Sequence, residues 1–438
     1  MKLFENIIPA TFLSRPNRFV LRCDLGGRTV NAYLPNPGRL WELLFPGTTV
    51  YLTKFPPSSE RKLKYLAVAV LRDGMPIMLH THHTNDVAAH LIRQNRIPGL
   101  EGAEIVKAEH TIGGSRFDFL LRKDGRDILL EVKSCTLVSD GLAMFPDAIS
   151  ARATKHVEEL AHLTGQGYGA AVLFVVGWPH ARYFMPEHHT DLEFSRALYN
   201  VRDRVMVRAV AIGWEKDLSL RLERAITGDS GNTFSRRDAE RADSCCPSNQ
   251  NHPRSSNLIR VQNELPFARN LAVPWGLVDR EAHDRGCYVI VLKLPRERKI
   301  AIGRLGEMRF RKGYYLYVGS AMKDLTKRIE RHRRLIKKYH WHIDYLREQA
   351  EFIAAIPIRA SVDLECLLAQ SAAKCAGWSI PGFGSSDCSC ESHLFGMTED
   401  PVHQRQFIEM LLYYRMGRLE EELGNAGPPP DFLPVTKL

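Results

Sequence analysis

The sequence predicts a multidomain protein of the α+β or α/β class, with two globular parts separated by a polar segment. Three observations indicate this organisation. The chain has 438 residues, which is too long for one ordinary hydrophobic core. In both halves, segments with the periodicity of paired strands alternate with segments of helical periodicity. Between the halves, residues 229–273 are polar and lack an apolar period, which predicts a disordered linker.

The first globular part is expected to begin with short strands and turns. Residues 18–25 and 28–34 alternate apolar and polar side chains, and Gly-Gly and Pro-Asn-Pro-Gly turns follow them. After residue 85 the periodicity becomes mixed. It predicts helices over 86–95 and 154–164, paired strands over 116–122 and 127–134, and a buried central strand over 170–178.

The apolar stretch 170–178 is the longest in the chain and falls well short of the ~20 residues that cross a bilayer. The N-terminal segment is interrupted by Glu5, Asn6 and Pro9 before an export signal could form. Nine cysteines without framework spacing fit a reducing compartment. We therefore expect a cytoplasmic protein with no membrane partner.

The second globular part is expected over residues 274–423, and a disordered tail over 424–438. Residues 286–292 predict a buried strand, and 299–306 and 312–321 predict further strands. Residues 323–338 predict a basic helix with Leu325, Ile329 and Leu335 on or near one face.

Positive charge is concentrated in this second part. The chain carries a net charge of +10, and residues 296–338 hold fifteen Lys or Arg against four acidic residues. The rest of the chain is therefore close to neutral. A basic helix after a strand turn suits a nucleic-acid phosphate backbone, although charge runs are also typical of solvated helix faces.

A cluster of acidic and basic side chains is expected in the first globular part. Glu131 and Lys133 are two residues apart in a predicted strand, so they share a face, while Val132 points into the core. A hairpin can bring Asp118 beside them. Two carboxylates can hold Mg²⁺, and an ammonium can orient a water for phosphodiester hydrolysis. A cross-strand ion pair without catalysis remains an equal alternative on these residues alone.

Six motifs give this part a family resemblance over about residues 1–228. They are RPNRF (15–19), LPNPGRL (34–40), RFDF (116–119), EVKSCTL (131–137), FPDAISARATKHVEEL (145–160) and LFVVGW (173–178). Together they resemble the sugar fermentation stimulation protein A family. The resemblance implies an OB-like barrel over 1–82, a PD-(D/E)XK nuclease-like domain over 83–228, DNA binding, and a regulatory role in sugar utilisation. It places Asp118, Glu131 and Lys133 on the nuclease-like positions.

Nucleic-acid contacts are expected from basic side chains on the barrel and at the start of the 154–164 helix, because OB-like grooves and helix N-termini bind phosphate. The candidates are Arg15, Arg18, Arg39, Arg152 and Lys155.

Two alternatives accompany these contacts. Phe19 and Trp41 are expected to point into the core rather than stack on bases. The helix start is expected to be capped by Thr154 or a residue near it, and its basic residues would then only be solvated.

The second part resembles the GIY-YIG nuclease superfamily over residues 275–400. The motifs are Gly286-x-Tyr288, IGRLGEMRFRKGYYLYVGSA (302–321), RIERHRR (328–334), HWHIDYL (340–346), ECLLAQ (365–370) and FGSSDCSCESHLFG (383–396). The resemblance implies a small α/β domain in which Tyr288 and Tyr317 flank the attacking water. It also implies that Arg328 holds the scissile phosphate and Glu365 binds Mg²⁺. Cys287 departs from the first motif at its middle position.

The same basic segment offers Arg331 and Arg334 as phosphate contacts. His332, His340 and His342 are either packed histidines or assistants in catalysis.

A zinc site is also considered at Cys388-x-Cys390-x-x-His393, with Cys366 and Cys375 upstream. This spacing lacks a pair of cysteines two residues apart. The sequence therefore favours reduced thiols packed near the second site over zinc.

The sequence as a whole predicts a metal-dependent endonuclease that uses Mg²⁺ or Mn²⁺ and acts on DNA. A non-catalytic DNA-binding regulator of sugar metabolism genes and a scaffold for a DNA-repair enzyme remain alternatives. The sequence does not indicate which proteins this chain binds.

Overall fold

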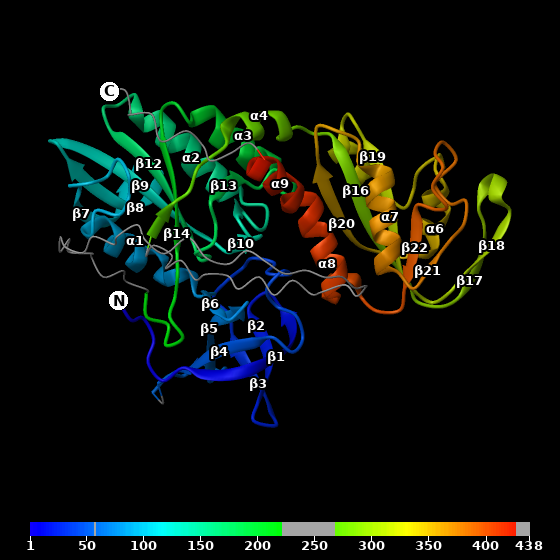
Figure 1. Ribbon diagram of the computed structural model, residues 1–438, viewed down its shortest axis with the longest axis horizontal. Helices are drawn as coiled ribbons and strands as arrows, with labels where there is room; N and C mark the ends of the chain where they lie inside the picture. Colours follow the sequence, from blue (N-terminus) through cyan, green and yellow to red (C-terminus); the bar gives the residue numbers. More distant parts are fainter. Residues whose placement is uncertain (57, 221–267, 426–438) are drawn as a thin grey trace, which may run out of the picture.

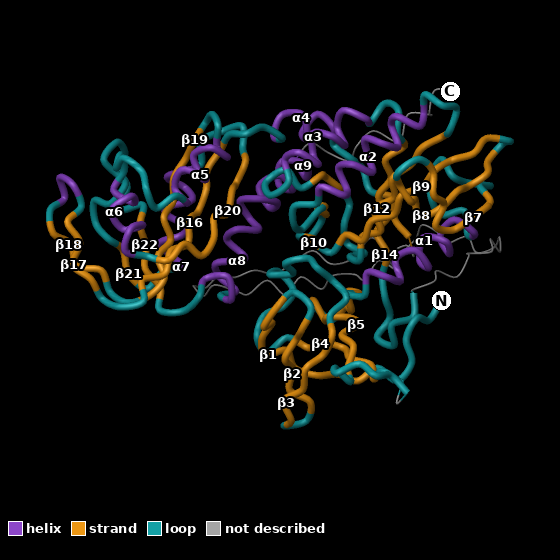
Figure 2. The backbone as a smooth tube through the Cα atoms, turned by 180° about the vertical axis from the view of Figure 1, so that it is seen from behind, coloured by secondary structure: helices purple, strands orange, loops and turns teal. Residues whose placement is uncertain are grey.

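The structure is a computed structural model that describes residues 1–56, 58–220 and 268–425. Figure 1 shows a barrel in blue, a mixed sheet with helices in cyan and green, and a C-terminal sheet with helices in yellow and orange. The barrel lies below the other two parts, and Figure 2 shows the same arrangement from behind. Within the described ranges, the helices are too short or too polar to traverse a bilayer.

The barrel is the predicted OB-like unit. Its strands are β1 (Ile8–Asn17), β2 (Val20–Leu25), β3 (Arg28–Tyr33), β4 (Thr49–Lys54), β5 (Tyr65–Arg72) and β6 (Met75–Met78). They are ordered β3-β2-β1-β4-β5-β6, and a parallel pairing of β3 with β5 closes five of them into a ring. Ala10 and Phe12 are buried between exposed neighbours in β1, as expected where alternate side chains fill a barrel.

The mixed sheet follows the barrel. Its strands are β7 (Glu104–Ile112), β8 (Ser115–Lys123), β9 (Arg126–Cys135), β12 (Gly169–Val176), β14 (Met206–Ile212) and β15 (Ala268–Asn270), in the order β15-β14-β12-β9-β8-β7. β9, β12 and β14 are parallel, and the outer strands are antiparallel to their neighbours. Helix α1 (Thr84–Arg93) packs on one face, and α2 (Ala151–Thr164) and α3 (Leu192–Val201) pack on the other. The helices and strands predicted between residues 86 and 178 are all present.

Part of the predicted linker is ordered. Residues 268–273 fall inside it, yet β15 pairs with β14 and the backbone N–H of Leu271 donates to the carbonyl of Ala209 at 2.9 Å. Leu271 is buried in the core of the mixed sheet. A few apolar residues after a long polar run give no measurable period, so the sequence could not separate them from the linker. The rest of the linker segment, and residues 426–438 of the predicted tail, lie outside the described residues.

A small sheet joins the mixed sheet to the end of the chain. It consists of β10 (Leu137–Val138), β11 (Leu142–Phe145) and β13 (Tyr183–Pro186). Helix α4 (Trp275–Glu281) packs with it in one apolar cluster, to which the C-terminal residues Met416 and Leu419 also belong. The end of the chain therefore returns to the first globular part.

The C-terminal sheet has the order β20-β16-β19-β22-β21 and is antiparallel. Its strands are β16 (Gly286–Leu294), β19 (Gly313–Ala321), β20 (Glu351–Arg359), β21 (Trp378–Ser379) and β22 (Leu394–Met397), and β17 (Arg298–Ala301) and β18 (Glu307–Phe310) form a separate hairpin. Helices α7 (Glu365–Cys375) and α8 (Arg405–Leu412) pack on one face. Helices α5 (Leu325–Arg333) and α6 (His342–Gln349) pack on the other.

The basic helix is shorter than predicted. Helix α5 ends at Arg333, and Arg334 adopts an extended conformation. Leu335 was expected on the buried face but is 54% exposed. The apolar period of the sequence fits only the two turns that contain Leu325 and Ile329, which are buried.

Buried ion pairs hold residues 415–418 at the contact between the two globular parts, one to each part. Arg415 donates to Glu187 at 2.8 Å, and Arg418, the first residue of α9 (Arg418–Asn425), donates to Glu281 at 2.8 Å. The side chains of Glu187 and Glu281 are 1% and 0% exposed. In Figure 1, α8 and α9 lie between the mixed sheet and the C-terminal sheet. The parts are therefore packed against each other and not merely tethered.

Candidate functional sites

The first site lies where β8 separates from β9. Their pairing runs as far as Phe119 opposite Leu130. Asp118 precedes Phe119 in β8 and lies just beyond the end of this pairing. Its Oδ2 accepts a hydrogen bond from the backbone N–H of Val132 at 2.7 Å. The side chain of Asp118 thus takes the place of a strand-to-strand hydrogen bond, beside Glu131 and Lys133. The side chain of Asn85, in α1, donates to the other oxygen of Asp118 at 2.7 Å.

Glu131 is the most buried charged group of this site, at 3% exposure. Its Oε1 contacts the Lys133 ammonium and lies 2.6 Å from Nδ1 of His156 in α2. Oε2 is buried, with no hydrogen-bond partner among the described residues. Burial alone would raise the pKa of Glu131, but the His156 hydrogen bond and the Lys133 charge outweigh it and lower the pKa.

Asp118 has the opposite shift. Its burial, and then the charge of Glu131, raise the pKa of its carboxyl above the usual value. Asp118, Glu131 and Lys133 are therefore brought together, as the hairpin predicted. The two carboxylates are close enough to repel each other.

The start of α2 presents the basic residues that the sequence assigned to phosphate. Arg152 and Lys155 are exposed. The N-cap is Ser150, whose side chain accepts from the backbone N–H of Ala153, and not Thr154, which is buried in the first turn. Ser150 immediately precedes the helix, where a short hydroxyl side chain can reach the free backbone N–H groups of the first turn.

The basic and aromatic residues considered as nucleic-acid contacts on the barrel differ in their burial. The guanidinium of Arg15 donates to the backbone carbonyls of Arg18, Asn36 and Arg39, and burial lowers its pKa. Arg15 therefore fixes the 36–40 turn. Arg18 and Phe19 are exposed together, and Phe19 is 43% exposed, so the expectation that its ring points into the core is wrong.

Arg39 and Trp41 lie at the contact between the parts. The guanidinium of Arg39 stacks 5.1 Å from the Trp41 ring. Burial and the charge of Arg415 lower the pKa of Arg39. Trp41 packs against the apolar cluster of α7 and α8, so it is partly buried as predicted, although in the core of the other part.

The second site is centred on two tyrosines of the C-terminal sheet. Tyr288 and Tyr317 are buried, and their ring centroids are 6.4 Å apart. Gly319 lies opposite Tyr288 in the strand register, and a Cβ on it would be 2.4 Å from the Tyr288 hydroxyl oxygen. Only glycine leaves room for the tyrosine there, which explains this residue of the motif.

The Tyr288 hydroxyl lies 2.9 Å from Nε2 of His332 in α5. Burial raises the pKa of Tyr288 and Tyr317 above their usual value. Burial and the Lys337 charge lower the pKa of His332 to about 3. At neutral pH the tyrosine is therefore protonated and the imidazole is neutral. Tyr288 donates this hydrogen bond in the tautomer of His332 that carries its proton on Nδ1.

Arg328 and Glu365 complete the second site. The carboxylate of Glu365, at the start of α7, accepts hydrogen bonds from the Ser320 hydroxyl and from Nδ1 of His393, the latter at 2.9 Å. The guanidinium of Arg328 lies 3.5 Å from the carbonyl of Ser320 and stacks on Trp341. The four predicted residues of this site are thus gathered around one end of β19.

Two further residues near the second site, Arg331 and Arg334, were predicted to contact phosphate, and their surroundings differ. Arg331 donates to the buried carboxylate of Asp344 at 3.0 and 3.2 Å, whereas Arg334 is exposed. The phosphate contact predicted for Arg334 implies that Arg334→Ala weakens DNA binding and lowers the slope of log K against log[salt] by about 1. Arg331→Ala should instead lower the free energy of unfolding by about 1.5–3 kcal/mol, because Asp344 loses a charged hydrogen-bond partner.

Salt-dependent DNA binding and urea unfolding of both variants check this difference. Equal losses of stability in the two variants would contradict the structural role of Arg331.

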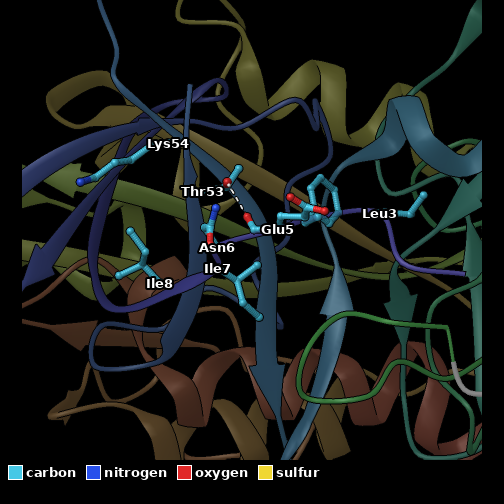
Figure 3. A pocket seen from close by; sticks show the side chains of 8 residues that line it. Leu3, Glu5, Asn6, Ile7, Ile8, Thr53 and Lys54 are labelled. Carbon is cyan, nitrogen blue, oxygen red and sulfur yellow. Dashed lines mark hydrogen bonds between the residues drawn. The ribbon is translucent and has the colours of Figure 1, made fainter. Parts of the chain in front are cut away.

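A separate cavity lies by the N-terminal segment. It has a volume of about 670 Å³ and is lined by residues 3–8 together with Thr53 and Lys54. Figure 3 shows the hydrogen bond from the Thr53 hydroxyl to the carbonyl of Glu5 beside it. The candidate catalytic residues do not line this cavity, so it does not enter the functional argument.

Several residues that hold the site side chains in place could not be predicted from the sequence. Asn85 bonds Asp118, and His156, for which the sequence predicted no separate role, bonds Glu131. His393 bonds Glu365 although it was weighed only as a zinc ligand. The pairs are 33, 25 and 28 residues apart, so spacing along the chain could not reveal them.

The fold and sites define a multidomain α+β protein with an OB-like barrel and buried polar clusters in both globular parts. Three family descriptions match: "SfsA N-terminal OB domain" over residues 13–79, "Sugar fermentation stimulation protein RE domain" over 82–217, and "Domain of unknown function DUF123" over 287–414. The chain belongs to the sugar fermentation stimulation protein family and carries a C-terminal domain of the third description.

Relatives match the first part of the chain. The sugar fermentation stimulation protein homolog of Methanothermobacter thermautotrophicus is 41% identical over 196 residues, which are 45% of this chain and 81% of the relative. That of Moorella thermoacetica is 40% identical over 199 residues, which are 45% of this chain and 86% of the relative. The solved structure of Pyrococcus furiosus SfsA in complex with Ca²⁺ is 30% identical, covers 50% of this chain and 94% of that chain, and has a TM-score of 0.46.

Proposed function

We propose that this protein cleaves phosphodiester bonds of nucleic acid, with DNA as the favoured substrate and Mg²⁺ or Mn²⁺ as the required ion. The observation that carries the proposal is the buried carboxylate of Glu131, whose Oε2 has no hydrogen-bond partner among the described residues. A buried ionised oxygen without a partner is costly in free energy. A cation bound at this oxygen would remove that cost.

Asp118 and Glu131 are the residues that would hold the ion. Carboxylate oxygens are the ligands that Mg²⁺ prefers. The raised pKa of Asp118, caused by burial and by the charge of Glu131, reflects a repulsion that a cation between them would relieve. When bound, a divalent ion supplies positive charge to the phosphate and lowers the pKa of a coordinated water.

The remaining residues of the first site have positioning roles in this proposal. The Lys133 ammonium, next to Oε1 of Glu131, would orient the attacking water and neutralise charge on the phosphate. His156 holds Oε1, which leaves Oε2 of Glu131 as the oxygen available to an ion. The exposed side chains of Arg152 and Lys155 would hold the nucleic-acid backbone near the helix that carries His156.

The second site would act on the same bond type. Arg328 would hold the scissile phosphate, and Tyr288 would take the proton of the attacking water as it passes its own to neutral His332. Tyr317, whose ring lies beside that of Tyr288, would flank this water. Glu365 would hold the ion, although both of its oxygens already accept hydrogen bonds that an ion would have to share.

A second candidate function is a DNA-binding regulator without catalysis. It is favoured by the way the acidic groups are neutralised from within the chain: Lys133 and His156 already contact Glu131, and Ser320 and His393 already contact Glu365. A scaffold for a DNA-repair enzyme is a third reading, which predicts a stable partner protein in pull-down experiments.

Nicking of supercoiled plasmid separates these functions. We expect the full chain to nick the plasmid with Mg²⁺ or Mn²⁺ and to stop when EDTA is added. A protein that binds the plasmid equally well with and without metal, yet leaves it supercoiled, would reject the cleavage proposal and support the regulator.

The role of Tyr288 can be tested in a Glu131→Gln chain, where only the second site remains. We expect Tyr288→Phe to reduce the remaining nicking by roughly 10²-fold, because the proton relay to His332 is lost. Tyr315→Phe is the matched control, since Tyr315 is equally buried in β19 but bonds the carbonyl of Arg311. Equal rates for the two variants would show that Tyr288 takes no part in the chemistry.

A further inference from the structure

A cluster of thiols and one imidazole lies beside Glu365. Cys366 is the second residue of α7, Cys388 and Cys390 lie in the loop between β21 and β22, and His393 immediately precedes β22. One ligand atom from each of these four residues lies within 4.8 Å of every other. Paired spacing of cysteines is absent here, so the spacing alone did not predict a metal site. The fold supplies the missing ligand from α7.

The dimensions of the cluster suit a tetrahedral ion. Zinc bonds of about 2.3 Å to sulfur and about 2.0 Å to nitrogen place the ligand atoms roughly 3.5–3.8 Å apart. The Cys388 sulfur is already 3.4 Å from Nε2 of His393. Since no two of the four ligand atoms are more than 4.8 Å apart, each separation would have to shorten by at most about 1 Å to reach this geometry.

The imidazole of His393 is oriented as a ligand. Its Nδ1 bonds a carboxylate oxygen of Glu365 at 2.9 Å, while its Nε2 faces the Cys388 thiol. A carboxylate bonded to the far nitrogen is the usual support for a histidine that ligates a metal, since it fixes the ring and the tautomer. The side chain of His393 is 2% exposed, so the ring is held in place.

The two ends of the loop that carries the cysteines are held by side-chain hydrogen bonds, from Ser392 to the carbonyl of Ile380 and from Ser379 to Glu391, at 2.6 Å each, but its tip, residues 385–390, has little to hold it. The two ends of the loop are also joined by backbone hydrogen bonds between Gly382 and Glu391 and between His393 and Phe383, at 2.8 Å each. Residues 384–392, GSSDCSCES, contain no aliphatic or aromatic side chain that could anchor the loop in the core. A cross-link from the loop to α7 would supply the anchor.

We propose that Cys366, Cys388, Cys390 and His393 bind a structural Zn²⁺ ion that ties the loop to the start of α7. Three thiolates and one imidazole are ligands that zinc prefers, and four protein ligands leave no open position for a substrate. The ion would also hold His393, and through it the carboxylate of Glu365. The site does not depend on cleavage by either nuclease-like site.

Metal analysis of the purified full chain tests the proposal. We expect one zinc ion per chain in the wild type and a near-complete loss in Cys388→Ser and in Cys366→Ser. Cys375→Ser is the matched control: Cys375 is the last residue of α7 and lies apart from the cluster, with its thiol near the carbonyl of Gln406 at 3.6 Å. Wild-type protein without zinc, or a Cys375→Ser chain that loses as much zinc as Cys388→Ser, would overturn the assignment.

A second measurement uses only the wild type, in case the variants do not fold. In a reducing buffer, a zinc chelator should raise the number of reactive thiols by three and lower the melting temperature, and added Zn²⁺ should reverse both changes. If the three thiols react at the same rate with and without chelator, the proposal fails. Since zinc content and thiol reactivity require no nuclease activity, failure of the cleavage proposal would leave both results unchanged.

Discussion

A Glu131→Gln substitution is expected to abolish metal-dependent cleavage at the first site, with a loss of roughly 10³-fold in rate. The amide is nearly isosteric, so it can keep the contact with His156, but it removes the charge that would bind the ion. The effect should be measured in a chain that already carries Glu365→Gln, so that cleavage by the second site does not mask it. DNA affinity in EDTA should stay within about twofold of the parent, because the substituted group is buried away from the basic surface.

Glu158→Gln is the matched control for this substitution. Glu158 lies in α2, two residues from His156, but it is exposed. Nicking rates that fall equally in the Glu131 and Glu158 variants would mean that net charge, and not the buried carboxylate, controls cleavage. An unchanged rate in Glu131→Gln would remove the first site from the proposal.

The largest effect on stability is expected from Glu281→Ala. The buried Glu281 carboxylate accepts hydrogen bonds from Arg418 at 2.8 Å, Arg280 at 2.9 Å and the Ser361 hydroxyl at 2.6 Å. Its removal leaves Arg418, which is 15% exposed, without a carboxylate partner inside the second globular part. Breaking a buried ion pair of this kind costs about 3–5 kcal/mol of unfolding free energy.

Glu422→Ala serves as the control, because Glu422 pairs with the same Arg280 at 2.6 Å but is 49% exposed. An exposed pair contributes at most about 1 kcal/mol. Urea unfolding of the two variants measures the difference. A loss in Glu281→Ala no larger than in Glu422→Ala would contradict a stabilising buried ion pair between Glu281 and Arg418.

The same carboxylate predicts a dependence of stability on acid. Burial alone would raise the pKa of Glu281, but the Ser361 and Arg418 hydrogen bonds outweigh it and lower the pKa to about 2. Because this value is below the usual pKa of about 4.3, the contribution is full above that pH and is lost as the pH falls toward 2. Over this interval wild type should lose roughly 3 kcal/mol more than Glu281→Gln. Parallel losses in the two proteins would contradict the lowered pKa.

Much of the fold could be predicted because its elements are periodic. The strand over 170–178 has a continuous apolar run, and it forms the fully buried centre of the mixed sheet. The paired strands around Asp118 and Glu131 were predictable for the same reason, since a two-residue spacing fixes which side chains share a face. The helix over 323–338 was overextended because Arg and Lys favour helices wherever they occur, while the exposed Leu335 has no buried surface to pack on.

The hydrogen-bond partners of the site residues were harder to predict than the positions of the sites along the chain. Arg15 and Arg331 have the charge of phosphate ligands, yet one binds backbone carbonyls and the other binds the buried Asp344. Charge gives no information on which partner lies within hydrogen-bond distance, because that depends on contacts between distant segments. The thiol cluster illustrates the same point, since Cys366 is separated from Cys388 by 22 positions and joins it only through the packing of α7 beside β22.

In the proposed function, the buried Glu131 of the first globular part and the half-buried Glu365 of the second each bind an ion that supports phosphodiester cleavage. The most direct test compares plasmid nicking by wild type, the Glu131→Gln and Glu365→Gln single variants, and the double variant, at equal DNA occupancy in Mg²⁺. The account predicts that each single variant keeps part of the activity and that the double variant has none. Nicking by the double variant at the wild-type rate would contradict it.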